Sequence, residues 1–263
     1  MREVGVRSDL SVAVSVWHAL FLREAGMRLA TGRAAWLWLL LEPAAHMVFL
    51  MVLFGLVRHQ VMRGANIELF ILTGVWGFFL FRNVATRCMD AISANQALFA
   101  YRQVRPVDTV LVRGAVELVL YVVVGAVLLA GLALCDIDIR PDDPLRVALA
   151  AALLWAFALG LGLCFSALSH LLPELGKLIR LAFTPLYFLS SVMYPIASVP
   201  AGARHWLLRN PVVHGLESLR AGYFAGYRGA AYAEPGYLAA CALAALFLGL
   251  ALHARHADAL AAQ

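Results

Sequence analysis

Long apolar segments recur along the chain, and they decide the solvent in which it folds. Six of them are each about as long as a helix that spans a hydrocarbon core. They lie at residues 34–57, 69–89, 109–134, 145–170, 177–194 and 236–252. Hydrophobic residues make up 63% of the 263 residues, against roughly 45–50% in an ordinary soluble chain. We therefore expect an all-α integral membrane protein with six transmembrane helices.

The distribution of Arg and Lys predicts how these spans are oriented. Positive residues favour the cytoplasmic side of a membrane. If the N-terminus is cytoplasmic, the inner segments hold more Arg and Lys than the outer ones, and the outer turn CDIDIRPDDP is acidic. The start of the chain lacks the apolar core of a secretory signal, so the first span directs insertion itself. The sequence thus predicts a multi-pass protein with both termini cytoplasmic.

Residues 1–33 precede the first span and contain a helical pattern. The segment LSVAVSVWHALFLREAGMRLATGR repeats apolar residues at helical spacing and carries Trp17 beside charged neighbours. This pattern predicts an amphipathic helix that lies in the membrane interface, with the tryptophan at headgroup depth. A short soluble helix that packs against a partner is the alternative.

The segment 90–106, between the second and third spans, is polar enough to leave the bilayer. Its sequence predicts a short cytoplasmic helix that is closed by Pro106. Because it is the longest internal cytoplasmic segment, we expect it to contact a partner subunit. The candidate contact residues are Leu98, Phe99, Tyr101, Arg102 and Arg105.

The stretch NPVVHGLESLRAGYFAGY, residues 210–227, has the start signals of a helix. Asn210 is a good N-cap and Pro211 suits the first helical position. Apolar residues then follow one ridge, whereas His214, Glu217 and Arg220 follow a second at i+3 spacing. The predicted helix is about 21 Å long, shorter than the roughly 30 Å core.

The turn-rich segment YPIASVPAGARHWLLRN precedes that helix and offers another short one. Residues 195–235 therefore resemble two half-helices that enter the membrane from outside and return. Irregular backbone at membrane depth is tolerated only against protein or a water-filled cavity, so this re-entrant pair would line a conduit. An amphipathic hairpin lying flat on the periplasmic surface is the alternative.

The order FTPLYFLSSVMYP, then VP, then NPVVHGLESLRAGYF resembles the C-terminal half of ABC-2 type exporter permeases, in particular the branch that exports capsular polysaccharides. The stretch RLATGRAAWLWLLLEP resembles the start of the same family. The resemblance covers essentially the whole chain as one transmembrane domain, with parts at 1–33, 34–194, 195–235 and 236–263. It implies a bacterial inner-membrane homodimer with six spans per subunit and re-entrant helices between spans five and six.

The resemblance also implies the activity: export of a capsular polysaccharide, anionic and lipid-linked, driven by two separate ATP-binding subunits. The chain has no GxxxxGK[ST] phosphate loop, so ATP and magnesium are expected in the partner ATPase and no cofactor or metal in this chain. The segment 90–106, with its five candidate contact residues, is then expected to couple to the ATPase. The other expected partners are a second copy, membrane lipid, and periplasmic and outer-membrane export proteins. No nucleic acid is expected.

Aromatic and charged residues within the spans are candidates for a conduit. Aromatic faces stack on the C–H faces of sugar rings, which suits a sliding polymer. Tyr187 and Tyr194, seven residues apart, are predicted to share one face of span five. Arg82 is the best candidate to contact an anionic polymer, unless it only extends to the interface. The full set of candidates is Trp36, Trp38, Trp76, Phe79, Arg82, Phe183, Tyr187 and Tyr194.

Two further charged positions are expected to be structural. Glu42 precedes Pro43 and would cap the kink there or pair with a basic residue, and Arg113 and Glu117 are predicted to pair with each other at i, i+4 spacing.

Three other functions remain open from the residues alone. The same fold would suit an O-antigen, teichoic-acid or drug exporter. A membrane glycosyltransferase or acyltransferase would need an acidic or histidine cluster at one interface, and none is visible. A proton-coupled carrier would have to use Glu42 and Glu117 as its proton sites.

Overall fold

The computed structural model describes residues 9–30, 35–57, 66–101 and 103–261, and every regular element among them is a helix. In chain order the elements are α1 (Asp9–Ala30), α2 (Ala35–Val57), α3 (Ile67–Met89), α4 (Ala91–Ala94), η1 (Gln96–Ala100), α5 (Pro106–Ala133), α6 (Pro144–Leu171), α7 (Pro173–Leu189), η2 (Ile196–Ser198), α8 (Ala201–Leu207), α9 (Pro211–Tyr223), η3 (Arg228–Tyr232), α10 (Pro235–Arg255) and α11 (Ala257–Ala261).

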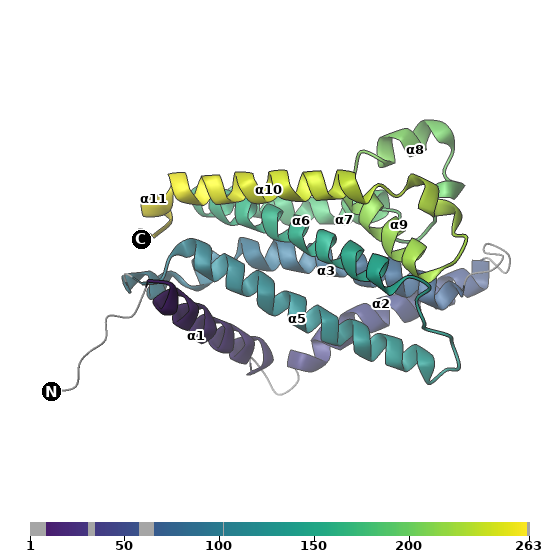
Figure 1. Cartoon of the computed structure of the whole chain (residues 1–263), viewed down its shortest axis with the longest axis horizontal. Helices are drawn as coiled ribbons and strands as arrows, with labels where there is room; N and C mark the ends of the chain where they lie inside the picture. Colours follow the sequence, from purple (N-terminus) through teal and green to yellow (C-terminus); the bar gives the residue numbers. More distant parts are fainter. Residues whose placement is uncertain (1–8, 31–34, 58–65, 102, 262–263) are drawn as a thin grey trace.

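The long helices α3, α5, α6 and α10 run side by side along the longest axis of the molecule (Figure 1). Helices α1 and α11 lie at one end of this bundle, which we call the α1 end. Helices α8 and α9 lie at the opposite end, the α9 end (Figure 1). The two ends therefore differ, since one carries both terminal helices and the other carries the short helices of the 195–235 region.

Within the described residues, four helices are long and apolar enough to cross a membrane: α3, α5, α6 and α10. Helix α2 contains a further apolar stretch, Leu40–Leu53. Helix α7 has 17 residues, about 26 Å at 1.5 Å per residue, so it is shorter than a roughly 30 Å core. The chain is an all-helical membrane protein, as the composition predicts.

The core lies where α3, α6, α9 and α10 meet. Phe81 of α3 stacks on Phe157 of α6, with 5.6 Å between ring centroids. Helices α6 and α10 approach closely because Gly160 lies at their contact. A Cβ atom there would come within 2.6 Å of the backbone nitrogen of Leu246. Small residues let transmembrane helices pack backbone to backbone, so Gly160 serves helix packing.

Helix α1 is bound to α5 by ion pairs that the sequence pattern did not predict. Arg113 pairs with Glu24 at 2.5 Å, and Glu117 pairs with Arg28 at 3.0 Å. The predicted i, i+4 pair between Arg113 and Glu117 is therefore wrong. Both side chains are largely buried beneath α1, where each finds an oppositely charged partner. Trp17 adds a hydrogen bond from its indole nitrogen to Asp108 at 2.9 Å.

Two predicted helix ends are also wrong, and proline explains one of them. The predicted fifth span reaches residue 194, but α7 ends at Leu189, so Tyr194 lies in the following turn. Pro106 does not close a helix; it begins α5. A proline suits the first helical turn, where its missing N–H needs no acceptor. The side chain of Asp108 then accepts the backbone N–H of Arg105 at 3.0 Å.

Candidate functional site

An aromatic and charged cluster lies where α2, α3 and α7 meet. We call it the α2–α3–α7 cluster; it consists of Glu42, His46, Phe79, Arg82 and Tyr187. The Tyr187 hydroxyl lies 2.6 Å from His46 Nε2, which joins α7 to α2. The His46 ring packs against both Phe79 and Tyr187, with centroids 5.4 Å and 5.2 Å away. The structure thus brings together three predicted conduit residues from two separate spans.

Arg82 is the positive centre of this cluster. Its guanidinium lies over the Phe79 ring, 4.4 Å from the centroid, which is a cation–π geometry. One terminal nitrogen binds the Glu42 carboxylate, and Nε donates to Asn83 at 3.1 Å. Glu42 therefore pairs with a basic residue, one of the two structural roles expected for it. The pair stays accessible, because the side chains of Arg82 and Glu42 are 27% and 49% exposed.

The other predicted conduit aromatics do not join this cluster as a group. Phe183 is buried beside Phe81. Trp76 is turned toward α5, where its indole donates to the Tyr121 carbonyl at 2.9 Å. Trp38 is exposed on α2. The side chain of Trp36 lies outside the described residues.

Tyr194 corrects the expectation for span five. It does not share a helix face with Tyr187, because α7 has already ended. Its hydroxyl instead donates to the carbonyl of Phe188 at 2.7 Å, which folds the turn back on the helix.

At the α9 end, α9 begins as the sequence predicts. The Asn210 side chain accepts the Val212 N–H at 3.0 Å, and Pro211 occupies the first turn. His214 is buried, and its Nδ1 accepts the backbone N–H of Glu234 at 3.1 Å. Its Nε2 must then carry the proton that reaches the Leu208 carbonyl at 2.8 Å. This histidine ties the chain segments on both sides of α9 to the helix.

Glu217 and Arg220 form an ion pair of 2.8 Å that is completely buried. Arg220 also donates to the carbonyls of Ser191 and Val192, at 2.7 Å each. Its guanidinium lies over Phe70, 3.7 Å from the ring centroid. Every contact of this arginine is therefore made inside the protein.

Glu217 is held as firmly as its partner. Its two oxygens accept hydrogen bonds from the hydroxyls of Ser191 and Tyr227, at 3.0 Å and 2.9 Å. Burial raises the pKa of the Tyr227 hydroxyl, so this group remains a donor. The predicted ridge of His214, Glu217 and Arg220 exists, but it faces protein, because α9 packs between α3, α6 and α10.

The bonds of Arg220 and Glu217 fix the turn that follows α7. Ser191 has a φ of 55°, a left-handed conformation that costs a non-glycine residue about 1–3 kcal/mol. Arg220 and Glu217 bind both the backbone and the hydroxyl of this residue, and they hold it there. Gly74 of α3 allows the approach, since a Cβ there would lie 2.4 Å from the Val192 carbonyl oxygen.

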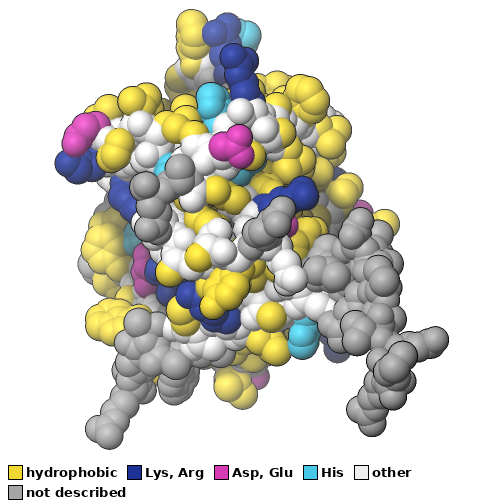
Figure 2. Space-filling model, turned by 90° about the vertical axis from the view of Figure 1, so that its left-hand side faces the viewer, with side chains coloured by type: hydrophobic (Ala, Val, Ile, Leu, Met, Phe, Trp, Pro, Cys, Tyr) yellow, Lys and Arg dark blue, Asp and Glu magenta, His cyan; other side chains and the backbone are white. Residues whose placement is uncertain are grey.

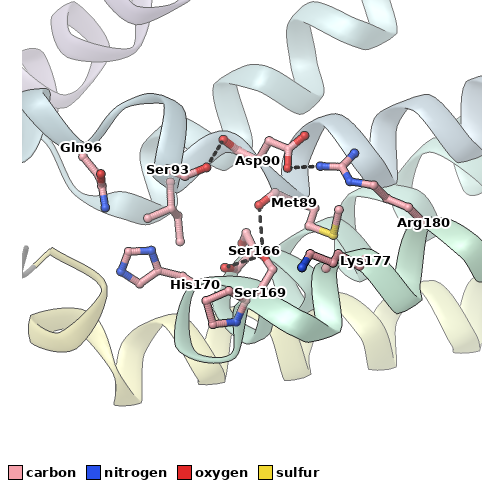
Figure 3. Close-up of a pocket in the computed structure, with 12 residues that line it drawn as sticks. Met89, Asp90, Ser93, Gln96, Ser166, Ser169, His170, Lys177 and Arg180 are labelled. Atoms are coloured by element: carbon pink, nitrogen blue, oxygen red, sulfur yellow. Dashed lines mark hydrogen bonds and ion pairs between the residues drawn. The ribbon is translucent and has the colours of Figure 1, made fainter.

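A pocket of about 450 Å³ opens at the α1 end. Figure 3 shows Ser93 and Gln96 on one wall and Ser169, His170 and Lys177 on the facing wall. Arg180 bridges the walls through a 2.5 Å ion pair with Asp90. The pocket therefore lies between residues 89–96 and the junction of α6 with α7.

The predicted partner-contact residues lie on the segment beside this pocket. Tyr101 is 67% exposed, Arg105 is exposed, and Leu98 and Phe99 are half-buried against the bundle. Arg102 lies outside the described residues. Groups of Lys and Arg side chains are visible on this end of the molecule (Figure 2).

Comparison with known proteins decides the family. A model of the ABC-2 type transporter family matches residues 16–224. The chain belongs to the ABC-2 type transporter family. It is 35% identical to polysialic acid transport protein KpsM of Escherichia coli, over 97% of this chain and 98% of that protein. It is also similar to two capsule polysaccharide export inner-membrane proteins: CtrC of Neisseria meningitidis (32% identical, 94% and 93% covered) and BexB of Haemophilus influenzae (29% identical, 94% and 92% covered).

This ABC-2 transporter chain is thus a multi-pass inner-membrane transport subunit, and the comparisons confirm the resemblance noted from its motifs. Sequence reasoning missed several residues of its sites. His46 was not singled out, and nothing in an apolar helix marks it as the partner of Tyr187. Ser191 and Phe70 were also missed, because their roles depend on contacts with residues far along the chain.

Proposed function

We propose that this chain is the membrane subunit of an ATP-driven exporter that carries a capsular polysaccharide across the bacterial inner membrane. The observation that carries the proposal is the match, over at least nine-tenths of its length, to the named capsule and polysialic acid proteins. Polysialic acid is an acidic polymer, which supports an anionic substrate. The accessible Arg82 supports the same charge. A lipid-linked form of the polymer is part of the proposal.

We propose a topology of six spans, formed by α2, α3, α5, α6, α7 and α10, with both termini cytoplasmic. The position of α1 and α11 at the same end supports an even number of crossings (Figure 1). The α1 end is then the cytoplasmic end. Helices α8 and α9 form the re-entrant pair at the outer end, since α9, with 13 residues, is about 20 Å long and too short to cross.

We propose that two copies of the chain enclose the conduit and that two ATP-binding subunits bind the cytoplasmic end. ATP and magnesium belong to those subunits, and this chain supplies no cofactor. The exposed Tyr101 and Arg105 would contact the ATPase. The pocket between residues 89–96 and the start of α7 would let that part of the chain move relative to α6 and α7. Periplasmic and outer-membrane export proteins would continue the path beyond the α9 end.

Deletion of the gene in its native host, followed by complementation, tests the function. We expect cells without the chain to lose surface capsule and to retain the polymer inside, and the unmodified chain to restore export. Affinity purification of the tagged chain from membranes should recover an ATP-binding subunit. Loss of O-antigen or teichoic acid with an intact capsule would instead indicate that the chain exports that polymer. Polymer that is no longer made at all would indicate a transferase.

Crosslinking tests the orientation separately. A cysteine at Tyr101 should crosslink to the ATPase subunit, whereas a cysteine at Asp138, in the turn between α5 and α6, should not. The reverse result would invert the proposed topology.

A further inference from the structure

Arg82 and Glu42 differ from the buried charged pairs of the bundle in their surroundings. The Arg220 pair is closed on all sides, and Glu117 is 2% exposed. Arg82 and Glu42 keep 27% and 49% of their side-chain surface accessible. Arg82 lies about 10 Å from the end of α3 at 1.5 Å per residue, and Glu42 about 10 Å from the start of α2. An accessible ion pair therefore lies inside two helices that the proposed topology places in the membrane.

The bonds of Arg82 and Glu42 show which of the two side chains can move away from the pair. The Arg82 side chain is supported by α3 itself, through the Phe79 ring and the Asn83 side chain. Among the described residues, Glu42 is the only carboxylate bonded to Arg82, and the Glu42 carboxylate has no hydrogen-bond partner other than Arg82. If Glu42 turned away, the guanidinium would keep its position and Glu42 would lose a single contact.

We propose that Arg82 is a binding site for an oxyanion of the exported lipid-linked polymer, and that Glu42 occupies this site until the substrate arrives. The inference rests on the proposed function and assigns that function a specific residue pair. The ligand class is a carboxylate of an acidic sugar or the phosphate of a lipid anchor. A guanidinium binds either one through paired hydrogen bonds.

An exchange of anions avoids the main cost of a charged site in a membrane. An unpaired arginine at this depth is unfavourable. Because one anion replaces another, Arg82 is never left without a counter-ion, and Glu42 turns toward the accessible side of the pair. The Tyr187 and His46 rings beside Phe79 form an aromatic wall next to the site. A polymer that passes residue by residue can then bind and leave while Arg82 stays paired with an anion.

A purely structural pair makes a different prediction, and binding measurements separate the two. If the pair only joins α2 to α3, removal of either charge weakens the fold and neither change tightens anion binding. If Glu42 competes with the ligand, Glu42→Gln must strengthen binding whereas Arg82→Gln abolishes it. The opposite signs of the two effects are the signature of competition.

The experiment uses the full chain in phosphatidylcholine nanodiscs. In one arm a fluorescent sialic acid oligomer is titrated and its anisotropy is measured. In the other arm, native mass spectrometry counts phosphatidylglycerol that the protein retains. We expect Glu42→Gln to tighten binding by roughly tenfold, the effect of one charge-assisted hydrogen bond. We expect Arg82→Gln to lose binding and Arg82→Lys to keep part of it, since Lys retains the charge without the paired donors.

Glu174→Gln is the matched control, because Glu174 forms an exposed i, i+3 pair with Lys177 at the α1 end; it should leave both arms unchanged. If only the oligomer shows Arg82-dependent binding, the site binds sugar carboxylates. If only phosphatidylglycerol shows it, the site binds lipid phosphate. Both support the proposal. Binding that does not depend on Arg82, or that Glu42→Gln does not tighten, overturns it. Size-exclusion profiles confirm that each variant is folded.

The binding result does not depend on export, so the two proposals fail separately. Arg82-dependent binding in a chain whose deletion leaves the capsule intact would reject the proposed function and keep the site. Normal capsule export together with no Arg82-dependent binding would reject the site and keep the function.

Discussion

Two ion pairs in this bundle have the same chemistry and opposite surroundings. Glu217 and Arg220, at the α9 end, are both 0% exposed, whereas Glu42 and Arg82, between α2 and α3, are 49% and 27% exposed. The first pair binds two backbone carbonyls and two hydroxyls from other segments. The second has one bond between its partners and an open side. Burial and the number of additional partners therefore separate a pair that holds the fold from a pair that can exchange.

The physical reason lies in what each charge loses if its partner is removed. Arg220 is fully buried, so without Glu217 it would remain charged in a closed site. Removing one member of a buried pair costs about 3–5 kcal/mol for this reason. Arg82 has an accessible side, where a ligand anion can replace Glu42. Removing the arginine charge should therefore damage the fold at the buried site and alter mainly binding at the accessible one.

The largest effect is expected from Arg220→Ala. It should destabilise the protein by about 3–5 kcal/mol, because it leaves Glu217 buried and unpaired and releases the Ser191 and Val192 carbonyls. Protein abundance in membranes and thermal unfolding in detergent would measure it. The exchange Glu217→Arg with Arg220→Glu should not restore stability, because a glutamate at 220 cannot donate to those carbonyls. A restored melting temperature would mean that charge alone, without the backbone contacts, maintains the α9 end.

A smaller loss is expected from Gly74→Ala, which leaves every charge in place. The new Cβ would lie 2.4 Å from the Val192 carbonyl oxygen and 2.6 Å from an Arg220 nitrogen. The turn after α7 must then move, and overpacking of this kind costs about 1–3 kcal/mol. Gly131→Ala is the control, since nothing lies within 4 Å of its Cβ position. Equal melting temperatures for the two variants would show that the turn is not held tightly against α3.

At the open pair, Arg82→Gln should reduce capsule export strongly while it lowers the melting temperature less than Gly74→Ala does. Both side chains of this pair are accessible at the protein surface, so removing the charge of Arg82 does not leave Glu42 in a closed site. Export is scored by surface polysaccharide per unit of membrane protein. If export falls only in proportion to protein abundance, the open pair is structural like the buried one.

Tyr187 allows a finer test of the α2–α3–α7 cluster. Tyr187→Phe keeps the ring and removes the hydrogen bond to His46, a loss of about 0.5–1.5 kcal/mol. Tyr187→Ala also removes the ring that packs against Phe78 and His46 and should cost more. If the ring face contacts the polymer, export should survive Tyr187→Phe and fall in Tyr187→Ala. Equal export from both variants would place the ring outside the path.

The smallest effect is expected at the exposed pair of Glu174 and Lys177. Their side chains are 82% and 78% exposed, and solvent screens such pairs almost completely. Replacing both with Gln should leave melting and export unchanged within error. A clear loss of export alone would indicate that this pair contacts the ATPase subunit.

The sequence by itself determined the solvent, the fold class and several local structures. Runs of about 20 apolar residues leave a helical membrane protein as the solution, because backbone groups in lipid must bond within their own helix. Asn210 and Pro211 predicted the start of α9, and the i+3 spacing placed Glu217 beside Arg220. The family could be recognised from the motifs because their order is a property of the sequence. All of these signals depend on neighbours within one or two helical turns.

The tertiary structure alone decided which side chains meet across the bundle. The i, i+4 rule paired Arg113 with Glu117, but each is closer to a charge on α1. The ridge on α9 has the pattern of a surface, yet it is enclosed by α3, α6 and α10. Helical spacing reports which residues share a face and does not report what covers that face. In this chain part of that cover comes from segments more than a hundred residues away, as when Phe70 packs against Arg220. This cover made one ion pair structural and left the other accessible.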